Sequence, residues 1–192
     1  MILLDNNQLV IASLFHASKS EEGLTEDLVR HLVLNMYRMY RSRFSAEYGE
    51  LIICNDGRNY WRKDLFEYYK ANRKKNRKSS SVDWNEYYKI MNVIGEEIIN
   101  NMPYKNIQID NAEADDIIAV LSRHFHTNEN IMIISSDKDF QQLQKYGNIV
   151  QYSPIQKKYI ETENPQEFTW EHILRGDPSD SIPNYLSPDD TF

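Results

Sequence analysis

The sequence has few of the features that stabilise secreted proteins or anchor membrane proteins. It contains one cysteine, Cys54, so no internal disulfide can form, and within the run LIIC this residue is expected to be a small buried hydrophobe. No run approaches roughly 18 consecutive apolar residues. The start MILLDNNQ has no basic region, and Asp5 interrupts its apolar run. We therefore expect no membrane span, no signal peptide and a reducing, cytoplasmic-type compartment.

Several common catalytic patterns are also missing. The sequence has 6 glycines but no glycine-rich phosphate loop, and no nucleophile-plus-base arrangement is recognisable. No internal repeat is visible. The 5 histidines show no spacing typical of metal ligands, so none is counted as one: His16, His31, His124, His126 and His172.

The composition is that of a folded domain with an uneven charge. The chain has 192 residues, 41% of them hydrophobic and 12% aromatic, enough for one large domain with a real core. The net charge is −7, yet residues 58–78 hold nine lysines and arginines against Asp64 and Glu67. That window carries +7, which leaves −14 for the rest of the chain. A single basic segment on an acidic body needs an explanation.

Short apolar runs alternate with helical periodicity along the chain. We predict strands at 1–4, 51–54, 106–109, 131–134 and 149–152, then a hairpin through Tyr159 and Ile160. Helices are expected at 24–44, from Ser80 or Ser81 to about Asn101, along the Ile117–Phe125 face, and at 169–175 before Gly176. This alternation predicts an α/β fold with a mostly parallel central sheet.

Acidic residues follow the ends of these predicted strands. In parallel sheets ligands bind at the carboxyl ends of the strands, so the fold would bring these acids onto one rim. Two like charges about 4 Å apart repel by roughly 4 kcal/mol at an effective dielectric constant near 20, so such a cluster needs bound cations or protons. Taken singly, each acid could instead be a helix or turn cap. The acids are Asp5, Asp56, Glu113, Asp115, Asp116, Asp137 and Asp139.

Carboxylates without histidine or cysteine partners favour a hard cation, so Mg²⁺ or Mn²⁺ is preferred over Zn²⁺. Two such ions about 4 Å apart would suit phosphoryl transfer. On a regular helix Asp115 points about 200° away from Glu113. Either Glu113 precedes the helix, or not all of Glu113, Asp115 and Asp116 contact metal directly.

The basic window RNYWRKDLFEYYKANRKKNRK interleaves cations with aromatic residues. Alone it could be a solvated helix. Beside a metal rim, cations would neutralise phosphates and aromatic rings would stack on unpaired bases. We interpret it as an arch over the metals, mobile without nucleic acid over 72–81. Lys70 and Arg73 are expected at the scissile phosphate, and Tyr69 and Lys74 are expected to contact substrate.

The motifs MILLD, IICNDG, YWRKDLFEYYKANR, AEADDIIAVL, ISSDKDFQQL and GDPSDSIPN, in this order, resemble the 5′ nucleases of the flap endonuclease superfamily. The resemblance implies a magnesium-dependent enzyme with a PIN-like sheet that acts on 5′ ends and flaps of DNA or RNA-primed DNA. It places the metal-site acids at the seven positions above, adds Asp177 and Asp180 as a last acidic pair, and matches Arg62, Lys70 and Arg73 to basic arch residues.

The sequence departs from the family at its end, where the chain stops at Phe192 without the helix-hairpin-helix module that grips duplex DNA. We expect a single nuclease domain over 1–192 with an arch at about 58–84, acting as a monomer. Either the chain is a truncated product, or another polypeptide supplies duplex binding. Three alternatives stay open: a PIN-like ribonuclease, a phosphoacceptor receiver domain, and a catalytically weak DNA-binding fragment.

Overall fold

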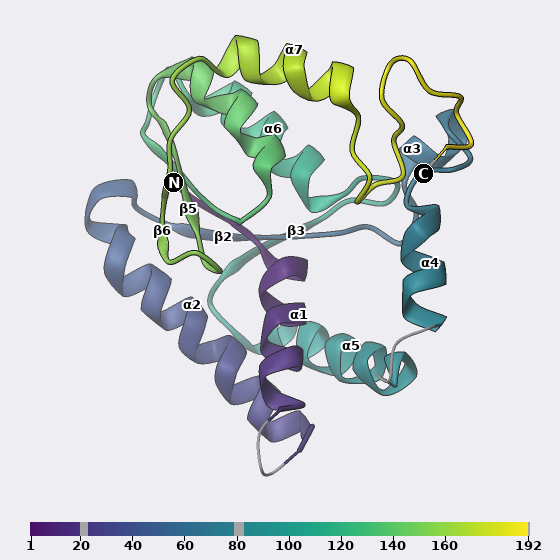
Figure 1. Ribbon diagram of the computed structural model, residues 1–192. Helices are drawn as coiled ribbons and strands as arrows, with labels where there is room; N and C mark the ends of the chain where they lie inside the picture. The colour runs from purple at the N-terminus through teal and green to yellow at the C-terminus, as the bar shows by residue number, and fades with distance from the viewer. Residues whose placement is uncertain (20–22, 79–82, 192) are drawn as a thin grey trace.

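The computed structural model describes residues 1–19, 23–78 and 83–191, except for the side chains at 74–76 and 78. Six strands form one sheet in the order β3-β2-β1-β4-β5-β6 (Figure 1). All neighbours pair in parallel except β5 and β6. The predicted mostly parallel α/β fold is confirmed. The strands are β1 (Ile2–Asp5), β2 (Leu51–Asn55), β3 (Lys105–Gln108), β4 (Ile131–Ile134), β5 (Ile149–Ser153) and β6 (Lys158–Ile160).

Helices cover both faces of the sheet (Figure 1). One face carries α1 (Asn6–Ala17), α2 (Glu26–Tyr48) and α5 (Trp84–Asn101), and the other carries α6 (Ala114–Phe125) and the 3₁₀ helix η1 (Lys138–Tyr146). Helix α7 (Pro165–Arg175) packs on η1. The basic window forms α3 (Trp61–Leu65) and α4 (Ala71–Lys78), which stand at one side of the sheet.

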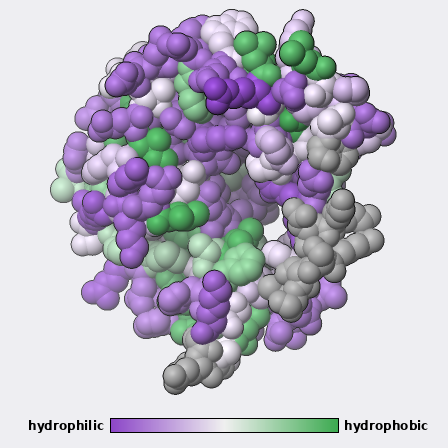
Figure 2. Space-filling view, in the orientation of Figure 1, coloured by the Kyte–Doolittle hydropathy of each residue, from purple (hydrophilic) through white to green (hydrophobic). Residues whose placement is uncertain are grey.

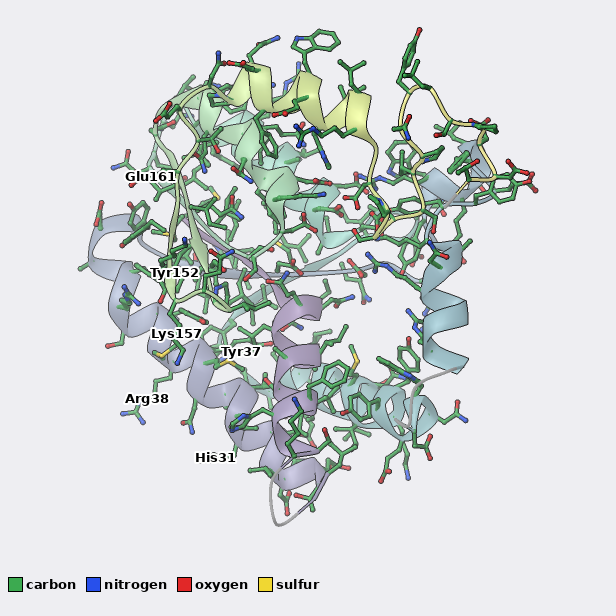
Figure 3. All side chains as sticks on the ribbon, viewed as in Figure 1. His31, Tyr37, Arg38, Tyr152, Lys157 and Glu161 are labelled. Carbon is green, nitrogen blue, oxygen red and sulfur yellow. The ribbon has the colours of Figure 1, made fainter. Side chains whose placement is uncertain are left out.

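The core explains why the strands read as unbroken apolar runs. Alternate residues of β1, β2 and β4 point to opposite faces, and both faces are covered, so both sets are buried. Tyr37 on α2 and Tyr152 on β5 lie between that helix and the sheet (Figure 3), and both belong to the core. The central strand residues of the two faces are Ile2, Leu4, Ile53, Met132 and Ile134 on one, and Leu3, Ile52, Cys54, Ile131 and Ile133 on the other.

The strand order reverses at β1. The chain runs from β1 outward to β2 and β3, then returns to place β4 on the other side of β1. Such a switch point opens a crevice beyond the carboxyl ends of the strands, where α/β folds bind ligands. Asp5 ends β1 and therefore stands at that crevice.

Some boundaries differ from those predicted. Helix α1 was not anticipated: Asp5 ends β1 and also caps α1, so strand and helix meet without a loop. Helix α7 begins at Pro165 rather than 169, because Asn164 caps it and proline suits the first helical position. The expected start of a helix at Ser80 or Ser81 lies outside the described residues, and the described helix α5 begins at Trp84 with Asp83 as its cap.

Within the described residues, no helix has the length and apolarity needed to cross a membrane.

Candidate metal centre and nucleic-acid site

Three acids at the carboxyl ends of β1, β2 and β4 line a cleft: Asp5, Asp56 and Asp137. Asp5 accepts a hydrogen bond from the Ser135 hydroxyl at 2.9 Å, and Asp56 accepts one from the backbone amide of Ala114 at 2.8 Å. Burial raises the pKa of Asp5 to about 6, and the charges of Asp56 and Asp137 push in the same direction. Burial also raises the pKa of Asp56. These carboxylates therefore repel one another at neutral pH unless a cation compensates them.

Glu113 is the best enclosed of the predicted ligands, with 1% of its surface exposed. It caps α6 in an extended conformation, and its backbone amide donates to Asp116 at 3.0 Å. Glu113 therefore precedes the helix proper, the first of the two arrangements considered from the sequence. Its carboxylate accepts hydrogen bonds from the Tyr69 hydroxyl at 2.6 Å, from Arg62 at 3.0 Å and from the Lys70 ammonium.

Arg62 binds the first turn of α6. Its two terminal nitrogens contact the two oxygens of Asp116 at 2.8 Å each, and Asp115 lies 3.9 Å away. Burial raises the pKa of Asp115 to about 7 despite this neighbour. Burial alone would raise the pKa of Asp116, but the hydrogen bonds and charge of Arg62, with hydrogen bonds from the Glu113 amide and Trp61, together hold that pKa below its usual value. Oxygen atoms of Glu113, Asp115 and Asp116 lie within 4.8 Å of one another, close enough to share one ion.

A second group of ligand atoms lies beyond Asp137. The Nε2 atom of His172 is 2.8 Å from Asp139 and 3.7 Å from Asp177, and Lys138 reaches Asp177 at 3.2 Å. One ligand atom each of Asp139, His172 and Asp177 lie within 4.8 Å of one another. Burial, with the Asp137 charge, raises the pKa of Asp139. Sequence spacing missed His172, because only the packing of α7 on η1 brings it to this position.

Asp180 lies in the same loop as Asp177 but has different partners. Its side chain accepts a hydrogen bond from Arg73 at 2.6 Å, and its carbonyl accepts one from the backbone amide of Lys70 at 2.8 Å. The loop is folded back on itself by an isolated bridge between Asp177 and Ile182. The last acidic pair therefore divides: Asp177 faces the second group, and Asp180 holds the start of α4.

The cleft brings together five of the nine predicted acids with Lys70 and Arg73. It has a volume of about 420 Å³. Figure 2 shows the surface hollowed beside α4, with both hydrophilic and hydrophobic residues around the hollow. The five acids are Asp5, Asp56, Glu113, Asp115 and Asp137, whereas Asp116, Asp139, Asp177 and Asp180 do not line this cleft.

Of the two predicted substrate contacts, Tyr69 differs from expectation and the Lys74 side chain lies outside the described residues. Tyr69 is only 5% exposed and donates to Glu113, so its ring is not open to a stacking base in this structure. The side chain of Lys74 and residues 79–82 of the expected mobile segment lie outside the described residues. The described part of that segment, residues 72–78, lies in helix α4.

The donor set fits hard divalent cations. Every predicted ligand is a carboxylate, the type that Mg²⁺ and Mn²⁺ prefer, and several carry pKa values raised by burial and mutual repulsion. Basic side chains neutralise part of the cluster: Arg62 and Lys70 contact Glu113, and Arg73 contacts Asp180. His172 adds one nitrogen donor to an otherwise all-oxygen set.

Comparison with known families matches residues 1–171 to the N-terminal, resolvase-like domain of the 5′–3′ exonucleases. The chain therefore belongs to this family. Ribonuclease H of Enterobacteria phage T4 is 36% identical over 186 residues, which cover 94% of this chain and 61% of that protein. A 5′–3′ exonuclease of Buchnera aphidicola subsp. Acyrthosiphon pisum is 31% identical over 162 residues, 79% of this chain and 52% of that protein. The chain thus spans only about half to three fifths of these relatives.

Two solved structures share the fold at 15% identity. The phage T5 5′-exonuclease with bound zinc has a TM-score of 0.76, covering 99% of this chain and 72% of that one. A phage T5 flap endonuclease complex with DNA and metal ions has a TM-score of 0.75, covering 97% of this chain and 70% of that one. At this identity the likeness shows the fold alone.

Proposed function

We propose that this chain is a Mg²⁺-dependent 5′ nuclease that hydrolyses phosphodiesters at or near the 5′ ends of RNA-primed, nicked or flapped DNA. The observation that carries the proposal is the cleft in which Asp5, Asp56, Glu113, Asp115 and Asp137 meet Lys70 and Arg73. An acidic floor with cations at its wall suits metal ions on one side of a phosphate and positive side chains on the other. Primer removal in phage-type DNA replication is the proposed setting, supported by the phage T4 relative.

Two groups of closely spaced side chains among the proposed ligands support a site for two ions. One lies around Glu113 and the other around Asp139 and Asp177. Bound ions would activate a water molecule and offset charge on the reacting phosphate. Mn²⁺ is expected to substitute for Mg²⁺, because both prefer oxygen ligands. The proposed ligands are Asp5, Asp56, Glu113, Asp115, Asp116, Asp137, Asp139, Asp177 and Asp180.

The cations have a role once the acids are compensated by metal. Lys70 and Arg62 now neutralise Glu113, and Arg73 neutralises Asp180. If metal takes over that compensation, the ammonium and guanidinium groups become available to the scissile phosphate, which favours phosphate recognition by a bidentate arginine and a lysine point charge. Tyr69 would then hold Glu113 in place, and Lys74 would contact the backbone of the substrate.

The same proposal places the chain as one nuclease domain over 1–192, with residues 58–84 as its arch. We propose DNA and RNA–DNA hybrids as substrates, a monomeric state and cytoplasmic action, in the host cell if viral. A replication protein or a separate duplex-binding polypeptide is the proposed protein partner. A PIN-like ribonuclease would cut single-stranded RNA without needing a 5′ end. A DNA-binding fragment would bind without cutting.

The proposal is tested with 5′-labelled flap and RNA-primed duplexes in Mg²⁺. Wild type should release short 5′ fragments, and EDTA should abolish release. Asp137→Asn should slow cleavage by roughly 100-fold or more, because it removes a charge at the reacting centre. Asp110→Asn is the matched control, since Asp110 is exposed in a turn outside both ligand groups. Cleavage that survives EDTA or the Asp137 variant would contradict the proposal.

A further inference from the structure

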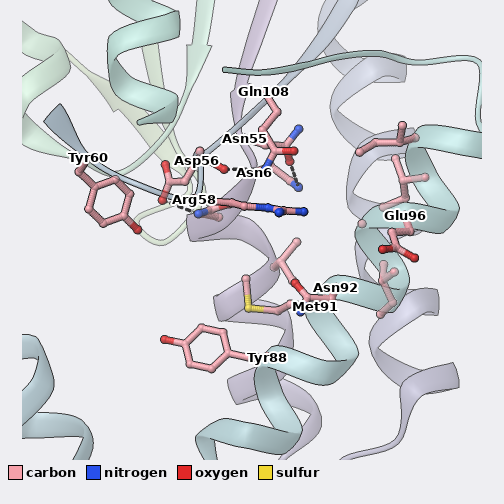
Figure 4. A pocket seen from close by; sticks show the side chains of 17 residues that line it. Asn6, Asn55, Asp56, Arg58, Tyr60, Tyr88, Met91, Asn92, Glu96 and Gln108 are labelled. Carbon is pink, nitrogen blue, oxygen red and sulfur yellow. Dashed lines mark hydrogen bonds between the residues drawn. The ribbon is translucent and has the colours of Figure 1, made fainter. Parts of the chain in front are cut away.

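A second cleft adjoins the first across Asp56. It has a volume of about 480 Å³ and lies between the start of α1, the ends of β2 and β3, and one side of α5 (Figure 4). The two clefts share part of their lining: Asn7, Asp56, Tyr60, Tyr88 and Met91. A ligand that reaches the proposed metal site can therefore continue into this space without leaving the surface.

One wall of the second cleft is built from interlocked amides. Asn6 donates to the Asn55 side chain at 2.7 Å and accepts from the Tyr37 hydroxyl, while Gln108 donates to the backbone carbonyl of Asp56 at 2.7 Å. Tyr37 is fully buried, which anchors this chain of hydrogen bonds in the core. The wall is thus both polar and fixed, as expected of a preformed ligand site.

Three other polar side chains that line the second cleft are not engaged in polar contacts among the described residues. Arg58, Asn92 and Glu96 are exposed, and within the described part of the chain their side chains make no hydrogen bond or ion pair. Figure 4 shows Arg58 extending under Asp56 toward the amide wall, with Asn92 and Glu96 reaching in from α5. This contrasts with Arg62, which is tied to acids. The guanidinium of Arg58 can therefore bind an anionic ligand without first breaking an ion pair.

We propose that this second cleft binds one unpaired nucleotide next to the scissile phosphate, a substrate subsite that rests on the nuclease function proposed above. Arg58 would bind the phosphodiester, because a guanidinium forms two parallel hydrogen bonds to phosphate. Asn92 and Gln108 would hydrogen-bond the edge of the base, and Tyr88 would contact its face. The volume excludes a duplex, and the Glu96 carboxylate opposes a second phosphate, so the occupant is a single unpaired nucleotide.

The subsite is tested by NMR with a 5′-phosphorylated single-stranded DNA pentamer, in EDTA so that no cleavage occurs. The side-chain amides of Asn92 and Gln108 and the Nε–H of Arg58 should shift on titration, and Asn92→Ala identifies its own signal. Arg58→Gln should weaken pentamer binding by about tenfold. Arg123→Gln is the matched control, because Arg123 is exposed on α6 and lines neither cleft.

The outcomes separate this subsite from the nuclease proposal. Unmoved Asn92 and Gln108 signals, or wild-type affinity in Arg58→Gln, would overturn the subsite. Cleavage of flap substrates is measured on the same samples in Mg²⁺. If wild type cuts nothing but the pentamer still shifts these signals, the nuclease proposal fails, and the second cleft is a nucleotide-binding site rather than a subsite for cleavage. If cleavage is normal while the signals stay unmoved, the subsite alone fails.

Discussion

The backbone amide of Lys70 donates to the carbonyl of Asp180 at 2.8 Å, and the Lys70 ammonium lies 3.9 Å from the Asp180 carboxylate. Lys70 has a φ of 58°, a conformation that non-glycine residues adopt mainly where surrounding contacts hold them. The start of α4 is therefore fixed to the last acidic loop of the chain. These contacts, with the hydrogen bond from Arg73 to Asp180, position the Lys70 and Arg73 side chains at the cleft.

Removing the Lys70 ammonium is predicted to lower kcat by roughly 100-fold while the fold persists, because a charge aimed at the reacting phosphate acts mainly in the transition state. The variant is Lys70→Met, which keeps the length and apolar stem of the side chain. Flap cleavage and circular dichroism are measured together. Lys145→Met, at an exposed position near Tyr146, serves as the control and should cut at the wild-type rate. Equal rates for both variants would remove Lys70 from the chemistry.

Arg62 is predicted to matter most for stability when metal is absent. Arg62→Met leaves Glu113, which is 1% exposed, and Asp116 without their guanidinium partner. Glu113 keeps its hydrogen bonds from Tyr69 and Lys70, but loss of the hydrogen bonds from the charged Arg62 costs about 1.5–3 kcal/mol, so the variant should unfold at lower urea in EDTA. Mg²⁺ should reduce the difference in unfolding free energy between the variant and wild type, because Mg²⁺ compensates the same carboxylates.

Arg30→Met provides the comparison for Arg62. Arg30 pairs with Glu26, Asp27 and Glu97 on the surface of α2 and α5, away from the cleft. Its loss should change stability equally with and without Mg²⁺. A metal-independent effect in Arg62→Met would show that this arginine is a general structural residue rather than a counter-ion of the metal site.

The raised pKa of Asp5 gives a pH dependence with a definite sign. Folding raises this pKa from 3.8 to about 6, so the folded state binds the proton more tightly than the unfolded state. The resulting stability is full below pH 3.8 and is lost as pH rises through about 6. In EDTA, Asp5→Asn should therefore melt higher than wild type at pH 8, by roughly 2–4 °C per kcal/mol relieved, with little difference at low pH.

Metal reverses that order. Mg²⁺ binds the ionised carboxylate, so wild type should gain more thermal stability from Mg²⁺ at pH 8 than at pH 5. Asp5→Asn should gain less than wild type at pH 8. Melting curves at the two pH values, each with MgCl₂ or EDTA, give the result. A Mg²⁺ effect that is independent of pH would contradict the assignment of Asp5 to the metal site.

Gly57 is predicted to be intolerant of any side chain. A Cβ there would lie 2.3 Å from the Ile109 carbonyl and 2.8 Å from that of Ala112, and the Gly57 amide donates to Ala112 at 2.7 Å. Gly57→Ala should cost about 1–3 kcal/mol by forcing β2 and the Glu113 turn apart. Gly95→Ala is the control, because a Cβ at Gly95 meets nothing within 4 Å and alanine favours the helix α5. Urea unfolding of both variants distinguishes local clash from a general intolerance.

The sequence was informative where the chain's own pattern determines structure. The runs 51–54 and 131–134 were predicted as buried strands and lie within or coincide with β2 and β4, because strands covered on both faces need continuous apolar side chains. The acids at the carboxyl ends were predicted from the same logic. Helix α1 was missed, since one residue, Asp5, serves as strand end, helix cap and rim acid together.

Contacts between distant elements could not be predicted in the same way. His172 reaches Asp139 only because α7 packs on η1, and nothing in its local spacing indicates this. Tyr69 was expected to stack on a base, but it lies buried against Glu113. The partners of Arg62, Lys70 and Arg73 likewise depend on how α3, α4 and the Asp180 loop come together. Sequence patterns located the groups, and packing determined which of them meet.

The most direct test of the account is the number of divalent ions that the chain binds, measured by EPR of free Mn²⁺ during titration. Wild type should bind two, one near Glu113 and one near Asp139 and Asp177. Glu113→Gln and Asp177→Asn should each weaken one site by roughly tenfold or more and leave the other, while Asp110→Asn should bind as wild type. The metal-centre assignment would be contradicted if wild type bound no Mn²⁺. It would also be contradicted if Glu113→Gln and Asp177→Asn bound Mn²⁺ with the same number of sites and the same affinity as wild type.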